Sequence, residues 1–188
     1  MMTNALALAN DTMTAEEFLQ METPLAGKYE LVCGKVIHLP PPGLRHCDVQ
    51  GNIYVLIRAF AKSTKCGRVF LEAGALLERD PDTVRGPDLS FYSVERMELD
   101  DENPKYNDMP PDLVVEVLSP NDRTGEMRRK LQEYFAAGVR LAWVVDPEDR
   151  TVTIHTEPLA SRTLTADQTL TGGEVLPGFT TSVTAIFD

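Results

Sequence analysis

The chain has 188 residues, of which 43% are hydrophobic and 25% are charged, and its formal net charge is -11. This length suits one α/β domain with its own core and is short for two. The negative charge argues against binding to nucleic acid through general basicity, because nonspecific affinity for phosphates comes from clustered Lys and Arg.

Several protein classes are disfavoured by features that the sequence lacks. No apolar stretch approaches the length that spans a bilayer, and residues 1–10 have no basic segment before their short Ala/Leu run, so we expect a soluble cytoplasmic protein. Three cysteines without CxxC spacing, accompanied by three histidines, do not indicate a disulfide framework or a zinc cluster. Neither a GxSxG motif nor a glycine-rich nucleotide loop occurs. We expect a flexible terminus over residues 1–13 and one domain over residues 14–188.

The first third of the chain predicts a short helix, a hairpin and a long helix. Thr14 and Glu17 form a capping box, which predicts a helix that runs to about Met21. Two strands, residues 29–32 and 35–38, flank a Cys-Gly turn and predict a β-hairpin. Apolar residues recur at helical spacing from residue 44 to about residue 62, which predicts an amphipathic helix with His46 on its apolar face.

The central region predicts strands around one further helix. We expect a strand over residues 69–78, a turn at residues 80–82 and a strand over residues 86–92, followed by an acidic loop over residues 95–109.

The run over residues 112–118 reads as a strand that is buried on both faces, and a helix over residues 124–137 ends at Gly138. A hairpin over residues 139–145 and 151–155 and short β elements complete the chain.

Two acidic residues mark a candidate site. Glu116 lies inside the strand that is predicted to be buried on both faces, and Asp88 begins the preceding predicted strand directly after a proline. A buried carboxylate costs several kcal/mol unless it is protonated, paired with a cation or bound to a metal. Two acids on neighbouring strands therefore suggest a divalent cation.

A lysine on the predicted helix lies where it can join these acids. Lys130 lies three residues after Met127 and four before Tyr134, on the flank of the inward face, and the helix starts shortly after the strand that carries Glu116. The alternative is a lysine that covers apolar surface with its stem. Although the net charge is negative, the sequence contains two clusters of basic residues. The first is Arg123, Arg128, Arg129, Lys130 and Arg140, and the second is Arg45, Arg58, Lys62, Lys65 and Arg68. For the second cluster we favour a helix face exposed to solvent.

Five short motifs occur in a characteristic order. They are Tyr29-Glu30-Leu31-Val32-x-Gly34-Lys35-Val36, Gly86-Pro87-Asp88, Pro111-Asp112-Leu113-Val114-Val115-Glu116-Val117-Leu118-Ser119-Pro120, Lys130-x-x-x-Tyr134-x-x-x-Gly138-Val139 and Trp143-Val144-Val145-Asp146-Pro147. Together they resemble the bacterial Uma-two family of restriction-endonuclease-like proteins, a branch of the PD-(D/E)xK nuclease superfamily, from about Thr14 to the C-terminus. The resemblance implies an α/β (α+β) restriction-endonuclease-like fold, in which helices flank a central mixed β-sheet, with an extra N-terminal hairpin and C-terminal β elements.

The resemblance also implies roles for individual residues. Asp88 and Glu116 would hold one Mg2+ or Mn2+, with the carbonyl of Val117 as a further ligand. The lysine that the superfamily usually carries two positions after the glutamate is replaced by Leu118, and the resemblance suggests that Lys130 takes its place.

Two weaker candidates complete the set. Glu30 either supports the metal or a lysine, or is an exposed strand acid. His46 either contacts substrate or orients a carboxylate, or is a core histidine that is satisfied by hydrogen bonds.

Three hypotheses follow. The first is a Mg2+-dependent endonuclease acting on DNA. The second, favoured by the acidic charge and by Leu118, is a catalytically weak or inactive nuclease-fold protein that binds nucleic acid or a protein partner. The third is a metal-dependent hydrolase of smaller phosphate esters. A homodimer would present two sites to a duplex and is expected on that ground, without a membrane partner.

Overall fold

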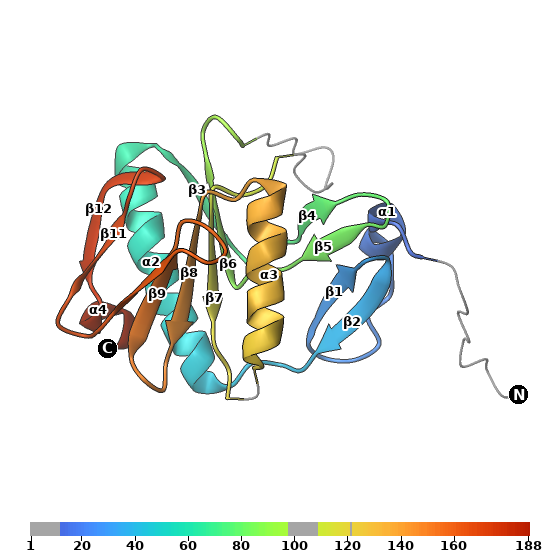
Figure 1. Ribbon diagram of the computed structural model, residues 1–188, viewed down its shortest axis with the longest axis horizontal. Helices are drawn as coiled ribbons and strands as arrows, with labels where there is room; N and C mark the ends of the chain where they lie inside the picture. The colour runs from blue at the N-terminus through green and yellow to red at the C-terminus, as the bar shows by residue number, and fades with distance from the viewer. Residues whose placement is uncertain (1–11, 98–108, 121) are drawn as a thin grey trace, which may run out of the picture.

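Two main β-sheets, a separate two-stranded pair and their flanking helices make up the described part of the fold. The computed structural model describes residues 12–97, 109–120 and 122–188 (Figure 1). The larger sheet has six strands in the order β10-β9-β8-β7-β6-β3, and the smaller has four in the order β2-β1-β5-β4. Strands β7 and β8 are parallel, whereas the other neighbours in the larger sheet are antiparallel. The larger sheet is therefore mixed, as the sequence predicts.

The elements have the following bounds. The smaller sheet contains β1 (Lys28–Val32), β2 (Lys35–Leu39), β4 (Ala75–Glu78) and β5 (Thr83–Arg85). The larger sheet contains β3 (Gly67–Leu71), β6 (Leu89–Ser93), β7 (Leu113–Val117), β8 (Leu141–Asp146), β9 (Thr151–His155) and β10 (Ser161–Leu164). A separate pair is formed by β11 (Thr169–Gly172) and β12 (Leu176–Ser182). The helices are α1 (Ala15–Leu19), α2 (Leu44–Thr64), α3 (Thr124–Ala137) and α4 (Thr184–Phe187).

The larger sheet is covered on both faces, with α2 behind it and α3 in front in Figure 1. Val115 and Val117 of β7 belong to the large core that includes Ile53 and Ile57 of α2. Val114 belongs instead to the smaller core beside α3, with Tyr134. Because successive strand residues point to opposite faces, Glu116 lies on the same face as Val114, toward α3.

Local sequence signals account for several of these elements. The capping box between Thr14 and Glu17 is formed, and α1 ends two residues before the predicted limit. Cys33 and Gly34 adopt positive φ angles of 49° and 72°, as a tight hairpin turn requires, so the predicted hairpin is confirmed. Helix α3 has the predicted bounds, and Gly138 ends it with a left-handed conformation.

The predicted strand over residues 69–78 is wrong. The chain forms two strands there, β3 in the larger sheet and β4 in the smaller, because Glu72 adopts a positive φ of 51° and breaks the extended run. The chain returns through β5 and crosses back at Gly86 and Pro87 to β6. The chain thus passes between the two sheets twice, and the short strand β5 was not predicted.

Two predictions fall on parts of the chain beyond this description. Residues 98–108 of the predicted acidic loop over residues 95–109 are outside the described part of the chain. Residues 1–11 of the predicted flexible terminus are outside it as well. Within the described ranges, no helix combines the length and apolar character needed to cross a bilayer.

Candidate active site between the two sheets

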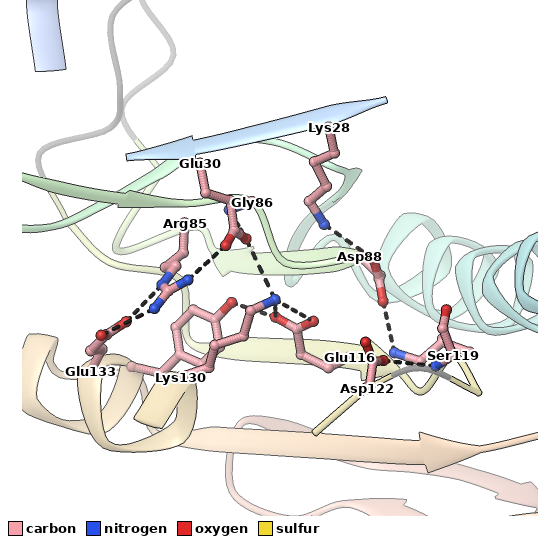
Figure 2. A network of polar contacts seen from close by, with 12 residues as sticks. Lys28, Glu30, Arg85, Gly86, Asp88, Glu116, Ser119, Asp122, Lys130 and Glu133 are labelled. Carbon is pink, nitrogen blue, oxygen red and sulfur yellow. Dashed lines mark hydrogen bonds and ion pairs between the residues drawn. The ribbon is translucent and has the colours of Figure 1, made fainter. Parts of the chain in front are cut away.

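Asp88 directly precedes β6 of the larger sheet and is held by contacts from β7 and β1. Leu89 pairs with Val115, so continuing the antiparallel register by one residue places Asp88 opposite Glu116. The Asp88 carboxylate accepts a hydrogen bond of 2.7 Å from the Val117 backbone N–H and lies 3.2 Å from Lys28 Nζ. These contacts fix the carboxylate between β7 and β1 (Figure 2).

Glu116 is buried against α3, with 4% of its surface exposed. Lys130 Nζ lies 3.1 Å and 3.3 Å from its two carboxylate oxygens, and the Tyr134 hydroxyl donates a short hydrogen bond to Oε1. Lys130 and Tyr134 are four residues apart and so share one helix face. The lysine therefore reaches Glu116 from the helix, and Tyr134 contributes a contact that the sequence indicated only as core packing.

Glu30 extends the cluster from the smaller sheet and is fully buried, so the interpretation as an exposed acid is wrong. Its carboxylate lies 3.5 Å from Lys130 Nζ and accepts hydrogen bonds from Arg85 Nη1 at 2.7 Å and from the Gly86 backbone N–H at 3.2 Å. Arg85 also donates from Nε to Glu133 of α3 at 2.6 Å. A continuous chain of charges thus links both sheets to α3 (Figure 2).

Lys28 is a site residue that sequence reasoning missed. It lies two residues before Glu30 on β1, so both side chains leave the same face of that strand toward the larger sheet. A Cβ at Gly86 would lie 2.9 Å from Lys28 Cε, closer than real Cβ atoms approach. Gly86 therefore leaves the space through which Lys28 reaches Asp88. The spacing from Glu30 was the signal available in the sequence.

His46 and Val117 also lie at the site. His46 Nε2 is 3.5 Å from Asp88 Oδ2, and its Nδ1 is 3.3 Å from Ser119 Oγ. These contacts are compatible with both interpretations of His46, and its role in orienting a carboxylate stays a prediction. Val117 contacts Asp88 through its N–H, and the metal-ligand role that we expect of its carbonyl stays a prediction.

The two central carboxylates are shifted in opposite directions. Burial opposes ionisation of Asp88, but the hydrogen bond to His46, the charge of Lys28 and the Val117 amide lower its pKa to about 2. Burial raises the pKa of Glu116, and Lys130 opposes that shift only in part. Burial also works against the charged form of Lys130, yet Glu116 and Glu30 outweigh it and raise the lysine pKa. Lys130 is therefore an ammonium at neutral pH.

The oxygen donors at this site fit a small hard cation. Mg2+ is typically held by one or two carboxylates and keeps several waters, so Asp88 and Glu116 provide a sufficient protein share. No group of three or more His, Cys, Asp and Glu side chains converges on a metal position in the described ranges.

Comparison with known proteins agrees with the motifs and the fold. The sequence profile of the Uma2 family, described as "putative restriction endonuclease", matches residues 15–184. The chain belongs to the Uma2 family. Among curated proteins, none matches it.

A crystal structure from Anabaena variabilis, described as a "putative nuclease belonging to DUF820", superposes on the Uma2 chain with a TM-score of 0.80. The two chains are 22% identical, and the match covers 93% of this chain and 97% of the other. At this identity the likeness establishes the fold, and the restriction-endonuclease-like architecture that the sequence predicts is confirmed.

Proposed function

We propose that this protein is a Mg2+-dependent endonuclease that hydrolyses DNA phosphodiester bonds at Asp88, Glu116 and Lys130. The observation that carries the proposal is the contact of Lys130 with Glu116 at 3.1 Å, on a strand whose register places Asp88 opposite the glutamate. Family membership supports nuclease chemistry in general terms. The metal, the substrate and the roles of these residues are the finer parts of the proposal.

The carboxylates would hold the cation. Asp88 and Glu116 would bind Mg2+ or Mn2+, with the Val117 carbonyl as a further oxygen ligand. When bound, the cation supplies Lewis acidity that polarises the scissile phosphate and acidifies a water molecule. His46 and the Val117 amide keep Asp88 oriented and ionised, while binding of the cation favours the ionised form of Glu116.

Lys130 would act as a fixed cation and not as a base. Its raised pKa keeps the ammonium protonated, so it can donate hydrogen bonds but cannot accept a proton near neutral pH. During hydrolysis, the water oxygen bonds to phosphorus and one P–O ester bond breaks, and negative charge increases on the oxygens involved. An ammonium already held by Glu116 and Glu30 stabilises that charge without reorganisation. Glu30 is thus a positioning residue for Lys130.

Substitution of Glu116 tests this function. Glu116→Gln keeps the size of the side chain but removes the charge, and we expect it to abolish cleavage of plasmid and single-stranded DNA with Mg2+ or Mn2+. Glu174→Gln changes an exposed acid near the β11–β12 turn and is expected to cleave like the unsubstituted protein. Equal cleavage by Glu116→Gln and Glu174→Gln would refute the assigned site. An RNA of the same sequence, assayed in parallel, decides between the two nucleic acids.

A second candidate function is a nuclease-fold protein with weak or no catalysis that binds nucleic acid or a protein. The burial of Asp88 and Glu116, each already paired with a lysine, favours it because a cation must displace or share those contacts. DNA binding that persists without metal and survives Asp88→Ala, with no cleavage by the unsubstituted protein, is expected of this function. A cytoplasmic homodimer is a further part of our proposal, and light scattering that gives the mass of one chain would contradict it.

A further inference from the structure

A pocket of about 470 Å³ opens beside the N-terminal half of α3. Its walls come from the end of β7, the first turns of α3, strands β8 and β9, and the segment that leads into β10. Leu118, Met127, Leu131 and Val144 give it an apolar floor, and the half-buried His155 adds a polar ring at one side. The pocket thus combines apolar and polar surface, as sites for small organic groups do.

The pocket adjoins the candidate active site through one strand. Leu118 continues β7, because its N–H donates to the Val145 carbonyl. Leu118 lies two residues after Glu116 and packs in the same small core as Tyr134 of α3. Tyr134 also contacts Glu116, so the side chains of Leu118 and Glu116 both point from the sheet toward α3. Two residues of extended chain span about 7 Å. The pocket therefore reaches the end of the same strand and the same sheet face that carry Glu116.

Two arginines at this pocket have no ionic partner among the residues that the structure describes. Arg123 and Arg128 line it and are exposed, and neither forms an ion pair within residues 12–97, 109–120 and 122–188. Arg129 next to them is paired with Glu133 at 3.4 Å. Asp122, an acid that also lines the pocket, accepts a hydrogen bond from the Ser119 N–H at 2.7 Å. In a chain with a net charge of -11, two unpaired cations at one pocket suit an anionic ligand.

We propose that this pocket binds an unpaired nucleotide next to the scissile phosphate, with the base on the apolar floor and the phosphate on Arg123 and Arg128. The proposal rests on the proposed nuclease function and makes its substrate more specific. A base can enter a pocket of this kind only when it is outside a duplex stack, so single-stranded or locally opened nucleic acid is the preferred substrate. Leu118, which stands where the superfamily usually has a lysine, thereby supplies part of the base-binding surface.

Binding of a fluorescent single-stranded oligonucleotide, measured by anisotropy with EDTA in the Glu116→Gln protein, tests the phosphate contacts. Adding Arg123→Gln and Arg128→Gln is expected to weaken binding about tenfold and to reduce the salt slope by about 0.7, the value for one phosphate contact on a single strand. Arg58→Gln with Arg68→Gln removes the same charge from α2 and β3 and is the matched control. Equal binding by the two double variants would overturn the proposal.

A second variant tests the base pocket separately from the charges. Thr153→Phe fills space from β9 with a residue that suits a strand, and we expect weaker binding with an unchanged salt slope. The protein with an unsubstituted pocket must also bind the single strand more tightly than a duplex of the same length. Equal affinities for the single strand and the duplex would refute the proposal. If the unsubstituted protein cleaves DNA but the Arg123→Gln and Arg128→Gln substitutions leave binding unchanged, nucleotide binding in the pocket is refuted and the nuclease function is not. If these substitutions weaken binding but the unsubstituted protein cleaves nothing, the nuclease function is refuted and nucleotide binding in the pocket is not.

Discussion

Replacement of Arg85 by Met should destabilise the fold more than any exposed charge change on α3. Arg85 is fully buried and bridges Glu30 of β1 to Glu133 of α3, at 2.7 Å and 2.6 Å. Removing one partner from a buried ionic group costs about 3–5 kcal/mol, because the remaining charge keeps its desolvation penalty. Among its partners in the described part of the chain, Glu30 would keep the Gly86 N–H and Lys130, the latter at 3.5 Å. A domain with about 5–15 kcal/mol of total stability would be left marginal.

Urea unfolding followed by fluorescence of the single, buried Trp143 measures this loss. Arg129→Met is the control, because Arg129 also pairs with Glu133 but is half exposed. It should cost less than about 0.5 kcal/mol, as exposed helix pairs do. Arg85 and Lys130 lower the pKa of Glu30 in the fold, so the stability that this carboxylate contributes is present above pH 4.5, the ordinary glutamate pKa, and is lost as the pH falls below it. The Arg85→Met deficit should therefore shrink below pH 4.5. Equal losses in the two variants would refute the argument that this network stabilises the fold.

Two further predictions concern Asp88 and Lys28. The pKa of Asp88 is about 2 in the fold against an ordinary 3.8, so its contribution of about 2 kcal/mol is present above pH 3.8 and is lost as the pH falls toward 2. In the Asp88→Asn variant without metal, the free energy of unfolding should lack this pH-dependent contribution between pH 3.8 and 2. The same pH dependence in the variant and in the unsubstituted protein would contradict the prediction. Lys28→Met should tighten Mn2+ binding about tenfold in calorimetry, or about 1.4 kcal/mol, because the competing ammonium at 3.2 Å is gone. Lys35→Met on the same hairpin is the control, and equal affinities of the two variants would exclude competition by Lys28.

The parts of the fold that were predictable are those with strong local signals. The uninterrupted apolar run around Glu116 indicated burial on both faces, and every residue of β7 is buried. The helical spacing of Met127, Lys130 and Tyr134 placed the lysine on the flank of the inward face, where it contacts Glu116. These inferences needed only the period of one element and the order of neighbouring elements.

The missed features depend on contacts between distant segments. Apolar alternation ran on past Glu72, and nothing local indicated that the chain would leave one sheet there for another. Arg85 meets its partners across 55 residues to Glu30 and 48 residues to Glu133, so no window of sequence contains the network. Lys28 was missed for the same reason, because its partner Asp88 is 60 residues away. The periodicity of a sequence shows on which face of its own helix or strand a side chain lies, but not which sheet packs against that face.

The number of residues in the connection from β5 to β6 is fixed by the contacts at its two ends. Arg85 is anchored in the smaller sheet, Asp88 is anchored against the larger one, and only Gly86 and Pro87 stand between them. One residue of extended chain spans about 3.3 Å, which is comparable to a whole hydrogen-bond distance. An insertion or deletion between Arg85 and Asp88 would therefore separate the arginine from Glu30 or the aspartate from Val117. This dipeptide works as a spacer of fixed length, and its length is as much a part of the site as the side chains on either side of it.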